Sequence, residues 1–324
     1  MIISKTPFRI PFAGGLTDLR PYATEYGGIT VSVTINKYVR IYLEKHEGKG
    51  FHIEYLDRIE SVEDFDSIEH KIIKTAIDML ELTEEPLRMK VISDFPTNSG
   101  LGSSGAFTVG ILNVLHAYKN ELVPQRKLAK EAAKIEIEIL NGSCGDHVPY
   151  ICSRGGLKKI LSDGSKPLFH SIKLSKRGWY ELQKRIILFY TGFSNDTNSS
   201  LGKLKENLKM NLEILHKIRK IGYTAADSLE RENFTTFYDM FEKQQENKMQ
   251  LTGNFFSKEI DDMIKNFRKI GCKSQIPGGK IGSFIIVLSD IEQIEKTLEI
   301  GKTLGLKKVD FMFEKEGSVL MKQE

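Results

Sequence analysis

Residues 96–106 read PTNSGLGSSGA and lead directly into the apolar run FTVGILNVL at residues 107–115. Glycines let a backbone approach a bulky anion because they carry no Cβ atom. The apolar run predicts a helix, and the first turn of a helix offers unpaired N–H groups and partial positive charge. The stretch therefore predicts a phosphate-binding loop at a helix N-terminus. The residues expected to hold the phosphates are Pro96, Gly100, Leu101, Gly102, Ser103, Ser104 and Gly105.

Two other interpretations of these glycines stay open. Their spacing also satisfies the G-x-G-x-x-G fingerprint of dinucleotide-binding folds, which should directly follow a strand and precede an acidic residue by about 20 positions. Here a loop separates the glycines from the strand-like run at 87–92, and Gln125 and Lys127 stand where the acidic residue is expected. The fingerprint is therefore disfavoured. The glycines could also serve only as a tight turn before a buried helix.

The composition is typical of a globular protein. A length of 324 residues, 40% of them hydrophobic, allows one large or two medium-sized domains. No apolar run approaches the roughly 20 residues of a membrane helix, and the N-terminus lacks a signal-peptide pattern. The net charge of +4 is mild, and no stripe of basic and aromatic residues predicts nucleic-acid binding. Cys144, Cys152 and Cys272 are too scattered for a disulfide framework or a zinc site, so a cytoplasmic location is expected.

A second group of polar residues lies near the N-terminus, where residues 6–19 read TPFRIPFAGGLTDL. Arg9 carries a fixed positive charge and a forked set of donors suited to phosphate. Asp18 is an acceptor suited to the hydroxyl groups of a polyol. The two residues predict a binding site around the Gly-Gly bend, although a surface salt bridge beside a turn would give the same pattern.

Together, the two segments resemble the GHMP kinase superfamily, which includes galactokinase, homoserine kinase, mevalonate kinase and phosphomevalonate kinase. The heptose-phosphate kinase branch, of the D-glycero-D-manno-heptose 7-phosphate kinase type, is the most similar. Its motifs run P-x-R-x-x-F-x-G-G-G-T-D-L and P-x-x-x-G-L-G-S-S, and both stand here almost letter for letter, with Leu16 as the departure. Residues 26–39 and 190–194 also look like that branch, so the resemblance covers most of the chain.

The resemblance implies the two-domain GHMP kinase fold of the α+β class, with an N-terminal half like ribosomal protein S5 domain 2 and a ferredoxin-like C-terminal half. An ATP-binding domain with the glycine-serine loop is expected at residues 1–170, and a C-terminal GHMP kinase domain at residues 171–324. The succession of strand-like and helix-like segments agrees with this class. Strands are predicted near 28–33, 38–44, 51–55, 86–92, 157–160, 185–190, 282–288 and 308–313, and helices near 68–81, 103–119, 126–140, 200–220, 223–231, 234–249, 258–270 and 290–304.

The resemblance also implies ATP and Mg²⁺ as cofactors, and Mg²⁺ prefers oxygen ligands. Residues 132–140 read AAKIEIEIL and offer Glu136 and Glu138. Because these lie two residues apart, they point about 200° apart on a helix, so only one can face the loop. The family pattern favours Glu136 as the metal ligand, together with Ser104.

A base for the acceptor hydroxyl is sought in residues 142–156, which read GSCGDHVPYICSRGG. Many family members carry an aspartate seven residues before a Gly-Gly pair, but that position is Val148 here. Asp146, nine residues before the pair, is the predicted catalytic residue, supported by Arg9 as in galactokinases. His147 is the alternative base, since its unperturbed pKa lies near neutrality. A third alternative, as in homoserine kinases, is that no such group exists.

Substrate-binding residues are expected from three segments, and the third of these segments departs from the family pattern. Residues 278–284 read GGKIGSF, where the family usually has a run of glycines. Lys280 in this segment could contact a phosphate or simply be a solvated loop lysine. The predicted substrate-binding residues are Thr17, Asp18, His147, Gly279 and Lys280.

The expected function is that of an ATP-dependent small-molecule kinase that transfers the γ-phosphoryl group to a hydroxyl of a sugar or sugar phosphate. A kinase of mevalonate or a mevalonate phosphate is the alternative within the family. A non-catalytic nucleotide-binding regulator is the alternative of another class. The expected partner is a small-molecule alcohol. A homodimer is compatible with this assignment, and neither nucleic acid nor a membrane is expected as a partner.

Overall fold

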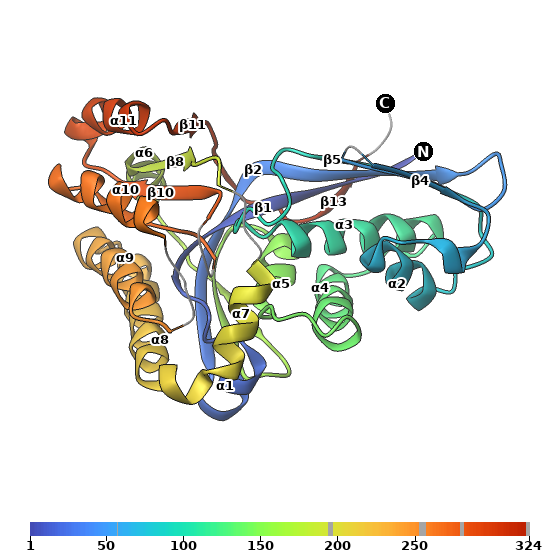
Figure 1. Ribbon diagram of the computed structural model, residues 1–324, viewed down its shortest axis with the longest axis horizontal. Helices are drawn as coiled ribbons and strands as arrows, with labels where there is room; N and C mark the ends of the chain where they lie inside the picture. Colours follow the sequence, from blue (N-terminus) through green and yellow to red (C-terminus); the bar gives the residue numbers. More distant parts are fainter. Residues whose placement is uncertain (57, 194–196, 253–256, 279–281, 322–324) are drawn as a thin grey trace.

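The computed structural model describes residues 1–324 except 57, 194–196, 253–256, 279–281 and 322–324. Two β-sheets organise the described chain (Figure 1). The larger sheet has strands β1 (Ile2–Gly14), β2 (Gly28–Lys45), β3 (Phe51–Tyr55), β4 (Arg58–Val62), β5 (Leu87–Ser93), β6 (Leu157–Ser162), β7 (Leu168–Ser171), β12 (Phe313–Glu314) and β13 (Val319–Met321). The smaller has β8 (Ile186–Tyr190), β9 (Lys273–Gln275), β10 (Phe284–Leu288) and β11 (Lys307–Val309).

The helices cover these sheets. Those around the larger sheet are α1 (Arg20–Tyr26), α2 (Lys71–Met79), α3 (Ser103–Tyr118), α4 (Gln125–Ala133) and α5 (His147–Arg154), with the π-helical segment η2 (Lys134–Ile139) after α4. Later in the chain come α6 (Lys176–Arg185), α7 (Thr197–Glu206), α8 (Leu208–Glu230), α9 (Phe234–Met249), α10 (Lys258–Lys269) and α11 (Ile294–Thr303). The short 3₁₀ turns η1 (Phe65–Ser67) and η3 (Ile291–Gln293) complete the order.

The antiparallel pair β1 and β2 forms the central part of the larger sheet. The register shifts between Pro7 and Phe8 and again between Pro11 and Ala13. Both shifts follow a proline, which cannot donate to the ladder and is therefore placed at bulges. The sequence predicts two strands near 28–33 and 38–44, but the structure joins them because the bulge absorbs the intervening residues without ending the strand.

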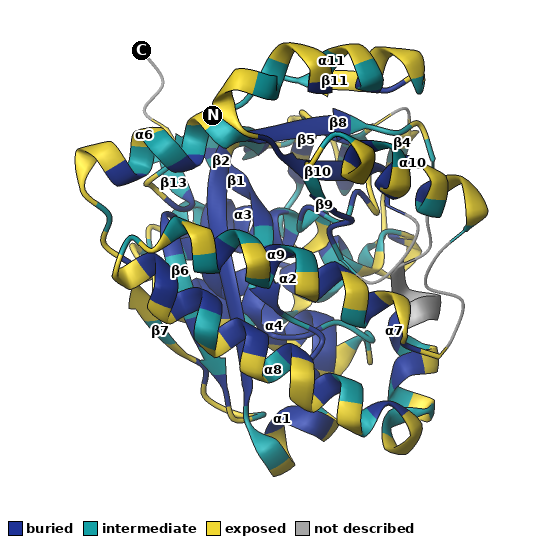
Figure 2. Cartoon of the chain, turned by 90° about the vertical axis from the view of Figure 1, so that its left-hand side faces the viewer, coloured by how far each residue is buried: buried dark blue, intermediate teal, exposed yellow. Residues whose placement is uncertain are grey.

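Helix α3 crosses β1 and β2 and also contacts α2, α4 and α5. It is buried along most of its length because its sequence is apolar on all sides, as expected for a core helix. Figure 2 shows the strands β1 and β2 as a buried layer behind the half-exposed helices α8 and α9. The N-terminus of α3 is thereby fixed between the sheet and α5.

The C-terminal segment does not stay with the smaller sheet. Strand β13 pairs with β1, and β12 pairs with β2, so the end of the chain returns to the larger sheet. The second sheet packs against α10 and α11 through a core of its own. The α+β class is confirmed, whereas the division at residue 170 stays a prediction.

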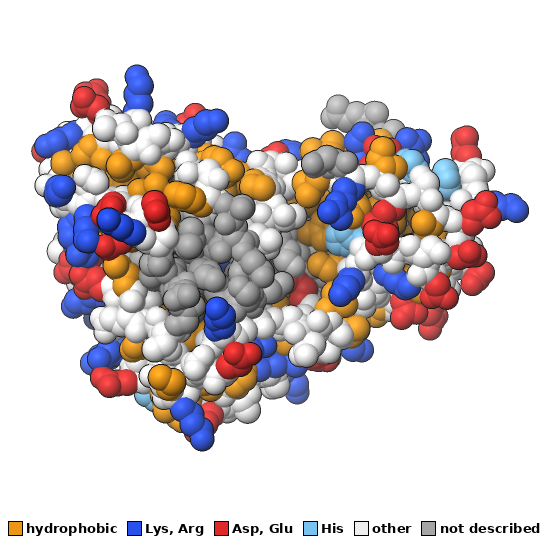
Figure 3. Space-filling model, in the orientation of Figure 1, with side chains coloured by type: hydrophobic (Ala, Val, Ile, Leu, Met, Phe, Trp, Pro, Cys, Tyr) orange, Lys and Arg blue, Asp and Glu red, His pale blue; other side chains and the backbone are white. Residues whose placement is uncertain are grey.

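Several element bounds differ from those expected. The helices predicted at 200–220 and 223–231 form α7 and the long α8, and the helix predicted at 126–140 is α4 continued by a π-helical segment. No helix in the described part of the chain has both the length and the apolar character needed to cross a bilayer. Basic and acidic side chains are interspersed on the face shown in Figure 3.

Candidate active site

A single cavity of about 550 Å³ gathers most of the residues that the sequence singles out. Its walls come from β1 and the bend after it, the loop before α3, the segment around η2 and α5, and α9. The predicted residues that line it are Arg9, Asp18, Gly100, Gly102, Ser103, Ser104, Gly105, Glu136 and His147.

The loop before α3 presents bare backbone to this cavity. Gly102 caps the helix in the left-handed region at φ 90°, and no side chain accepts from the first amides of α3. A Cβ atom on Gly100 would lie 2.6 Å from the carbonyl oxygen of Pro277, and one on Gly105 would lie 2.6 Å from Val148 Cγ1. Only glycine fits at these contacts, so the amides at the start of α3 remain available to an anion.

Two residues predicted for the same loop have other positions. The side chain of Leu101 is fully buried in the core, and its carbonyl oxygen accepts a hydrogen bond from Arg9 N at 2.9 Å. Pro96 is exposed and lies outside the residues that line the cavity. Both therefore shape the loop rather than face the cavity.

Glu136 lies beside the loop hydroxyls. Ser104 Oγ donates to Glu136 Oε2 at 2.8 Å, while Oε1 is buried without a hydrogen-bond partner. Burial raises the pKa of this carboxyl above its usual value. Glu138 points the other way, is exposed, and pairs with Arg20 at 2.6 Å. The expected opposition of the two carboxylates is confirmed, even though their segment is π-helical rather than α-helical.

This pair fits a magnesium ion. No group of three or more His, Cys, Asp or Glu side chains suited to a metal occurs within the described ranges. Mg²⁺ does not need one, because it keeps several waters and is held by one or two carboxylates plus substrate phosphates. The unused Oε1 of Glu136 and the Ser104 hydroxyl supply such oxygens next to the amides of α3.

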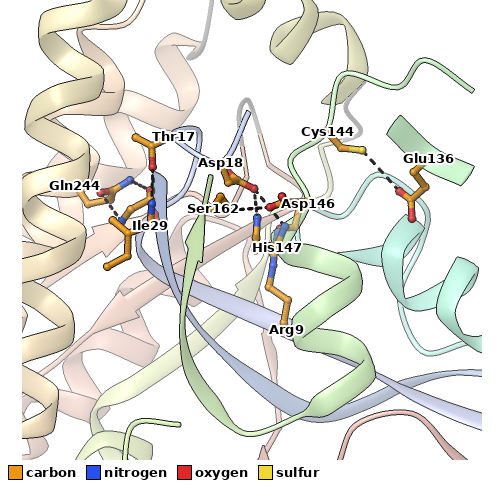
Figure 4. Close-up of polar contacts among 12 residues, drawn as sticks. Arg9, Thr17, Asp18, Ile29, Glu136, Cys144, Asp146, His147, Ser162 and Gln244 are labelled. Atoms are coloured by element: carbon orange, nitrogen blue, oxygen red, sulfur yellow. Dashed lines mark hydrogen bonds and ion pairs between the residues drawn. The ribbon is translucent and has the colours of Figure 1, made fainter. Parts of the chain in front are cut away.

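Asp18 and His147 form a buried ion pair at the other side of the cavity (Figure 4). His147 Nδ1 lies 2.5 Å from Asp18 Oδ2, and the backbone N–H of His147 points at the same oxygen at 3.5 Å. Burial would raise the pKa of Asp18, but the charge and hydrogen bonds of His147 outweigh it and lower that pKa. Asp18 is therefore ionised.

Gly145 makes this pairing possible. A Cβ atom at that position would lie 1.8 Å from Asp18 Oδ2 and 2.3 Å from its Cγ. We expect Gly145→Ala to displace the Asp18 carboxylate, because the Asp18 side chain is short and 98% buried and cannot bend around the added methyl group. Turnover should fall at least about 10-fold, and thermal unfolding should shift to lower temperature. Gly202→Ala is the matched control, because a Cβ there meets its nearest atom only at 3.5 Å; equal behaviour of the two variants would contradict the expectation.

Two predicted residues do not reach the cavity. Asp146 stands at the N-cap position of α5, its Oδ1 accepts from Ser162 Oγ at 2.7 Å, and neither residue is among those that line the cavity. Burial and the charge of Asp18 raise the pKa of Asp146 to about 7. The Thr17 hydroxyl is fully buried and bonds to the backbone N–H and C=O of Ile29, each at 3.2 Å. The structure thus gives both side chains hydrogen-bond partners within the protein, and the roles predicted for them stay predictions.

Arg9 is fixed against the glycine loop. Its Nη1 donates to the carbonyl oxygen of Gly100 at 2.6 Å, whereas its Nε is buried without a partner. Burial lowers the pKa of Arg9 to about 10, although Asp18 nearby acts in the opposite direction. A guanidinium in this state remains charged at neutral pH and can receive an anion.

Two polar residues of α9 on the opposite wall could not be singled out from the sequence. Lys248 of α9 is 97% buried, and its Nζ donates to the carbonyl oxygen of Ile276. Burial, reinforced by Arg9, lowers its pKa to about 7. Gln244 holds the backbone of Gly14 through both amide atoms, at 3.1 and 2.7 Å. Polar residues in the segment KQQENKM look like a solvated helix face, so no sequence signal separates Lys248 from its neighbours.

Four residues that line the cavity carry unsatisfied polar atoms. Two of these atoms are nitrogens and two are oxygens. Each of the four is buried and has no hydrogen-bond partner among the described residues. Such groups are costly unless a ligand pairs with them. They are Arg9 Nε, His147 Nε2, Thr30 Oγ1 and Glu136 Oε1. Gly279 and Lys280 lie outside the described residues.

Residues 70–156 match the family model of the GHMP kinases N terminal domain. Among curated proteins, D-glycero-alpha-D-manno-heptose 7-phosphate kinase of Campylobacter jejuni is 26% identical over 98% of this chain and 97% of its own length. Among solved structures, a D-glycero-D-manno-heptose 1-phosphate kinase from Bacteroides thetaiotaomicron covers both chains fully, with a TM-score of 0.81 and 20% identity. Phosphomevalonate kinase of Streptococcus pneumoniae covers 97% of this chain and all of its own, with a TM-score of 0.78 and 16% identity.

The matched family segment contains the glycine-serine loop, α3, Glu136 and the Asp18-binding segment around His147. The full-length likeness to solved kinases confirms the GHMP kinase fold. Residues 70–156 thus match the GHMP kinases N terminal domain, and the chain as a whole is similar to kinases of this fold over nearly its full length.

Proposed function

We propose that this protein is an ATP-dependent kinase that transfers the γ-phosphoryl group to a hydroxyl of a sugar or sugar phosphate. One observation carries the proposal: the free amides of α3, the Ser104–Glu136 pair and the Asp18–His147 pair line one cavity. A kinase needs these three elements together, because phosphoryl transfer is mostly positioning and neutralisation of phosphate charge. The heptose-phosphate kinase relative over nearly the whole chain supports it.

The nucleotide end of the cavity is proposed at the loop before α3. The backbone of Gly100, Gly102 and Gly105 and the first amides of α3 would hold the triphosphate. Ser104 and Glu136 would hold Mg²⁺, which neutralises phosphate charge when bound. Arg9 would pair with phosphate oxygens through its free Nε.

The acceptor end is proposed between Asp18, His147 and Lys248. The Asp18–His147 pair there suits a sugar hydroxyl, while the buried Arg9 guanidinium and the buried Lys248 amine suit an anionic group on the acceptor. A sugar phosphate satisfies both kinds of group. A mevalonate phosphate is also an anionic alcohol, and the fold shared with phosphomevalonate kinase keeps this second candidate in the test.

An ATPase-coupled assay with sugars, sugar phosphates and mevalonate phosphates distinguishes these candidates. Activity with a sugar or sugar phosphate is the expected result. Activity restricted to mevalonate or its phosphates would favour the second candidate. Tight ATP binding without phosphorylation of any acceptor would indicate a nucleotide-binding regulator.

Ser104→Ala tests the loop directly. The variant loses the hydroxyl that contacts Glu136 and the proposed metal site, so kcat should fall about 10²-fold. Ser175→Ala, at the exposed end of a distant helix, is a matched control that should keep its turnover. An unchanged kcat in Ser104→Ala would contradict the assignment of the loop.

We also propose a cytoplasmic location, where ATP is supplied and where the three free cysteines would stay reduced. The homodimer remains a prediction, which sedimentation velocity of the purified chain would check.

A further inference from the structure

His147 and Asp18 lie closer to the cavity than the carboxylate expected to act as base. His147 begins α5 and is 92% buried, and Asp18 is 98% buried. Both side chains line the cavity that also holds Ser104 and Glu136. Their contact joins Nδ1 of the imidazole to Oδ2 of the carboxylate at 2.5 Å.

This contact determines which nitrogen carries the proton. Asp18 is ionised and can only accept, so Nδ1 of His147 must donate to it. In a neutral imidazole, the second nitrogen then has a free lone pair. The contact with Asp18 therefore leaves Nε2 of the neutral imidazole as a proton acceptor.

Nε2 has no partner of its own. It is buried, and no described residue makes a hydrogen bond with it. A buried ring nitrogen without a partner is costly, unless a ligand hydroxyl supplies the missing donor. Because His147 lines the cavity, an acceptor hydroxyl bound there can supply it.

Neighbouring groups do not compete for this role. Asp146 is bound to Ser162 outside the lining, and the apolar Val148 occupies the wall beside Gly102 and Gly105. Of the two unpartnered nitrogens among the described residues at the cavity, Arg9 Nε can only donate, so His147 Nε2 is the one that can accept a proton.

We propose that His147 is the catalytic base of this kinase and that Asp18 is its positioning residue. The inference rests on the proposed function, because it assumes an alcohol as phosphoryl acceptor. The arrangement replaces a single carboxylate base with an imidazole held by a carboxylate, which fixes the tautomer and stabilises the imidazolium.

Phosphoryl transfer exchanges one P–O bond for another. The acceptor oxygen forms a bond to the γ-phosphorus, and the bond from that phosphorus to the bridging oxygen of ADP breaks with its electron pair going to ADP. The hydroxyl proton moves to Nε2 of His147, and the resulting positive charge is paired with the Asp18 carboxylate.

The test uses the intact protein with ATP and the best acceptor from the panel, in single-turnover experiments that separate chemistry from product release. His147→Gln should slow phosphoryl transfer about 10²- to 10³-fold while ATP binding changes less than about twofold. In His147→Ala, added imidazole should restore part of the rate, because the cavity of about 550 Å³ can admit it. His170→Ala, an exposed histidine on β7, is the matched control and should keep the wild-type rate.

Asp18→Asn adds a readout that a structural role would not give. The amide keeps the shape but cannot neutralise the imidazolium, so kcat should fall about 10-fold or more while the KM for the acceptor changes less. A wild-type transfer rate in His147→Gln would overturn the inference, as would a large loss in Asp146→Asn together with no imidazole rescue of His147→Ala. If the wild-type protein phosphorylates no acceptor at all, the proposed function itself fails, and the base assignment fails with it.

Discussion

Replacing Glu136 by glutamine should lower kcat by about 10²- to 10³-fold. The change keeps the size of the side chain and its contact to Ser104, but it removes the charge that would hold Mg²⁺. Higher Mg²⁺ concentrations should recover part of the rate, because the remaining oxygens bind the ion more weakly. Steady-state kinetics over a Mg²⁺ titration would measure both effects.

Glu138→Gln is the matched control for this prediction. The two glutamates lie two residues apart, but Glu138 is exposed and pairs with Arg20 on the outside of the molecule. Its loss should change kcat less than about twofold, since exposed ion pairs contribute little. Equal kinetics of the two variants would contradict the metal assignment.

Lys248→Met should have opposite effects on binding and stability. The variant loses the buried Lys248 amine, which a bound phosphate would hold in its charged form, so the KM for a sugar phosphate should rise about 10²-fold, while the KM for the same sugar without its phosphate should change little. It should also unfold at a higher temperature near neutral pH, because a buried ammonium is replaced by an apolar side chain of similar length. Lys243→Met, exposed on the same helix, is the control for both measurements.

The gain in stability should depend on pH. Burial lowers the pKa of Lys248 from 10.5 to about 7, so between these values the unfolded chain binds the proton and the folded chain does not. The free energy of unfolding of the wild-type protein should therefore rise with pH across this window. Lys248→Met should lack that contribution, so its advantage should be largest below about pH 7 and vanish above about pH 10.5. A difference between the two proteins that is constant with pH would contradict the burial argument.

The sequence predicts the local elements of the site well. The choice of Glu136 over Glu138 comes from the family resemblance, whereas the loop before α3, the start of that helix and the opposition of the two glutamates follow from glycine spacing and helical periodicity. These are short-range properties that one segment determines by itself. The joined strand β2 shows the limit, because its continuity depends on the register of β1.

Long-range partners could not be predicted. Asp146 looks like the only carboxylate in its loop, but its hydrogen bond to Ser162 comes from β6, and the sequence does not show that pairing. The Thr17 hydroxyl likewise forms a hydrogen bond with the backbone of Ile29, which the sequence does not show. Lys248 faces the cavity only because α9 packs against β9 and β1. Such contacts arise from tertiary packing, which no single segment encodes.

A crystal structure with Mg²⁺ and a non-hydrolysable ATP analogue would show where the nucleotide and the ion bind. We predict the triphosphate on the amides of residues 102–105, with the ion between Ser104, Glu136 and phosphate oxygens. A nucleotide bound at another surface, with the loop before α3 free of it, would contradict the account.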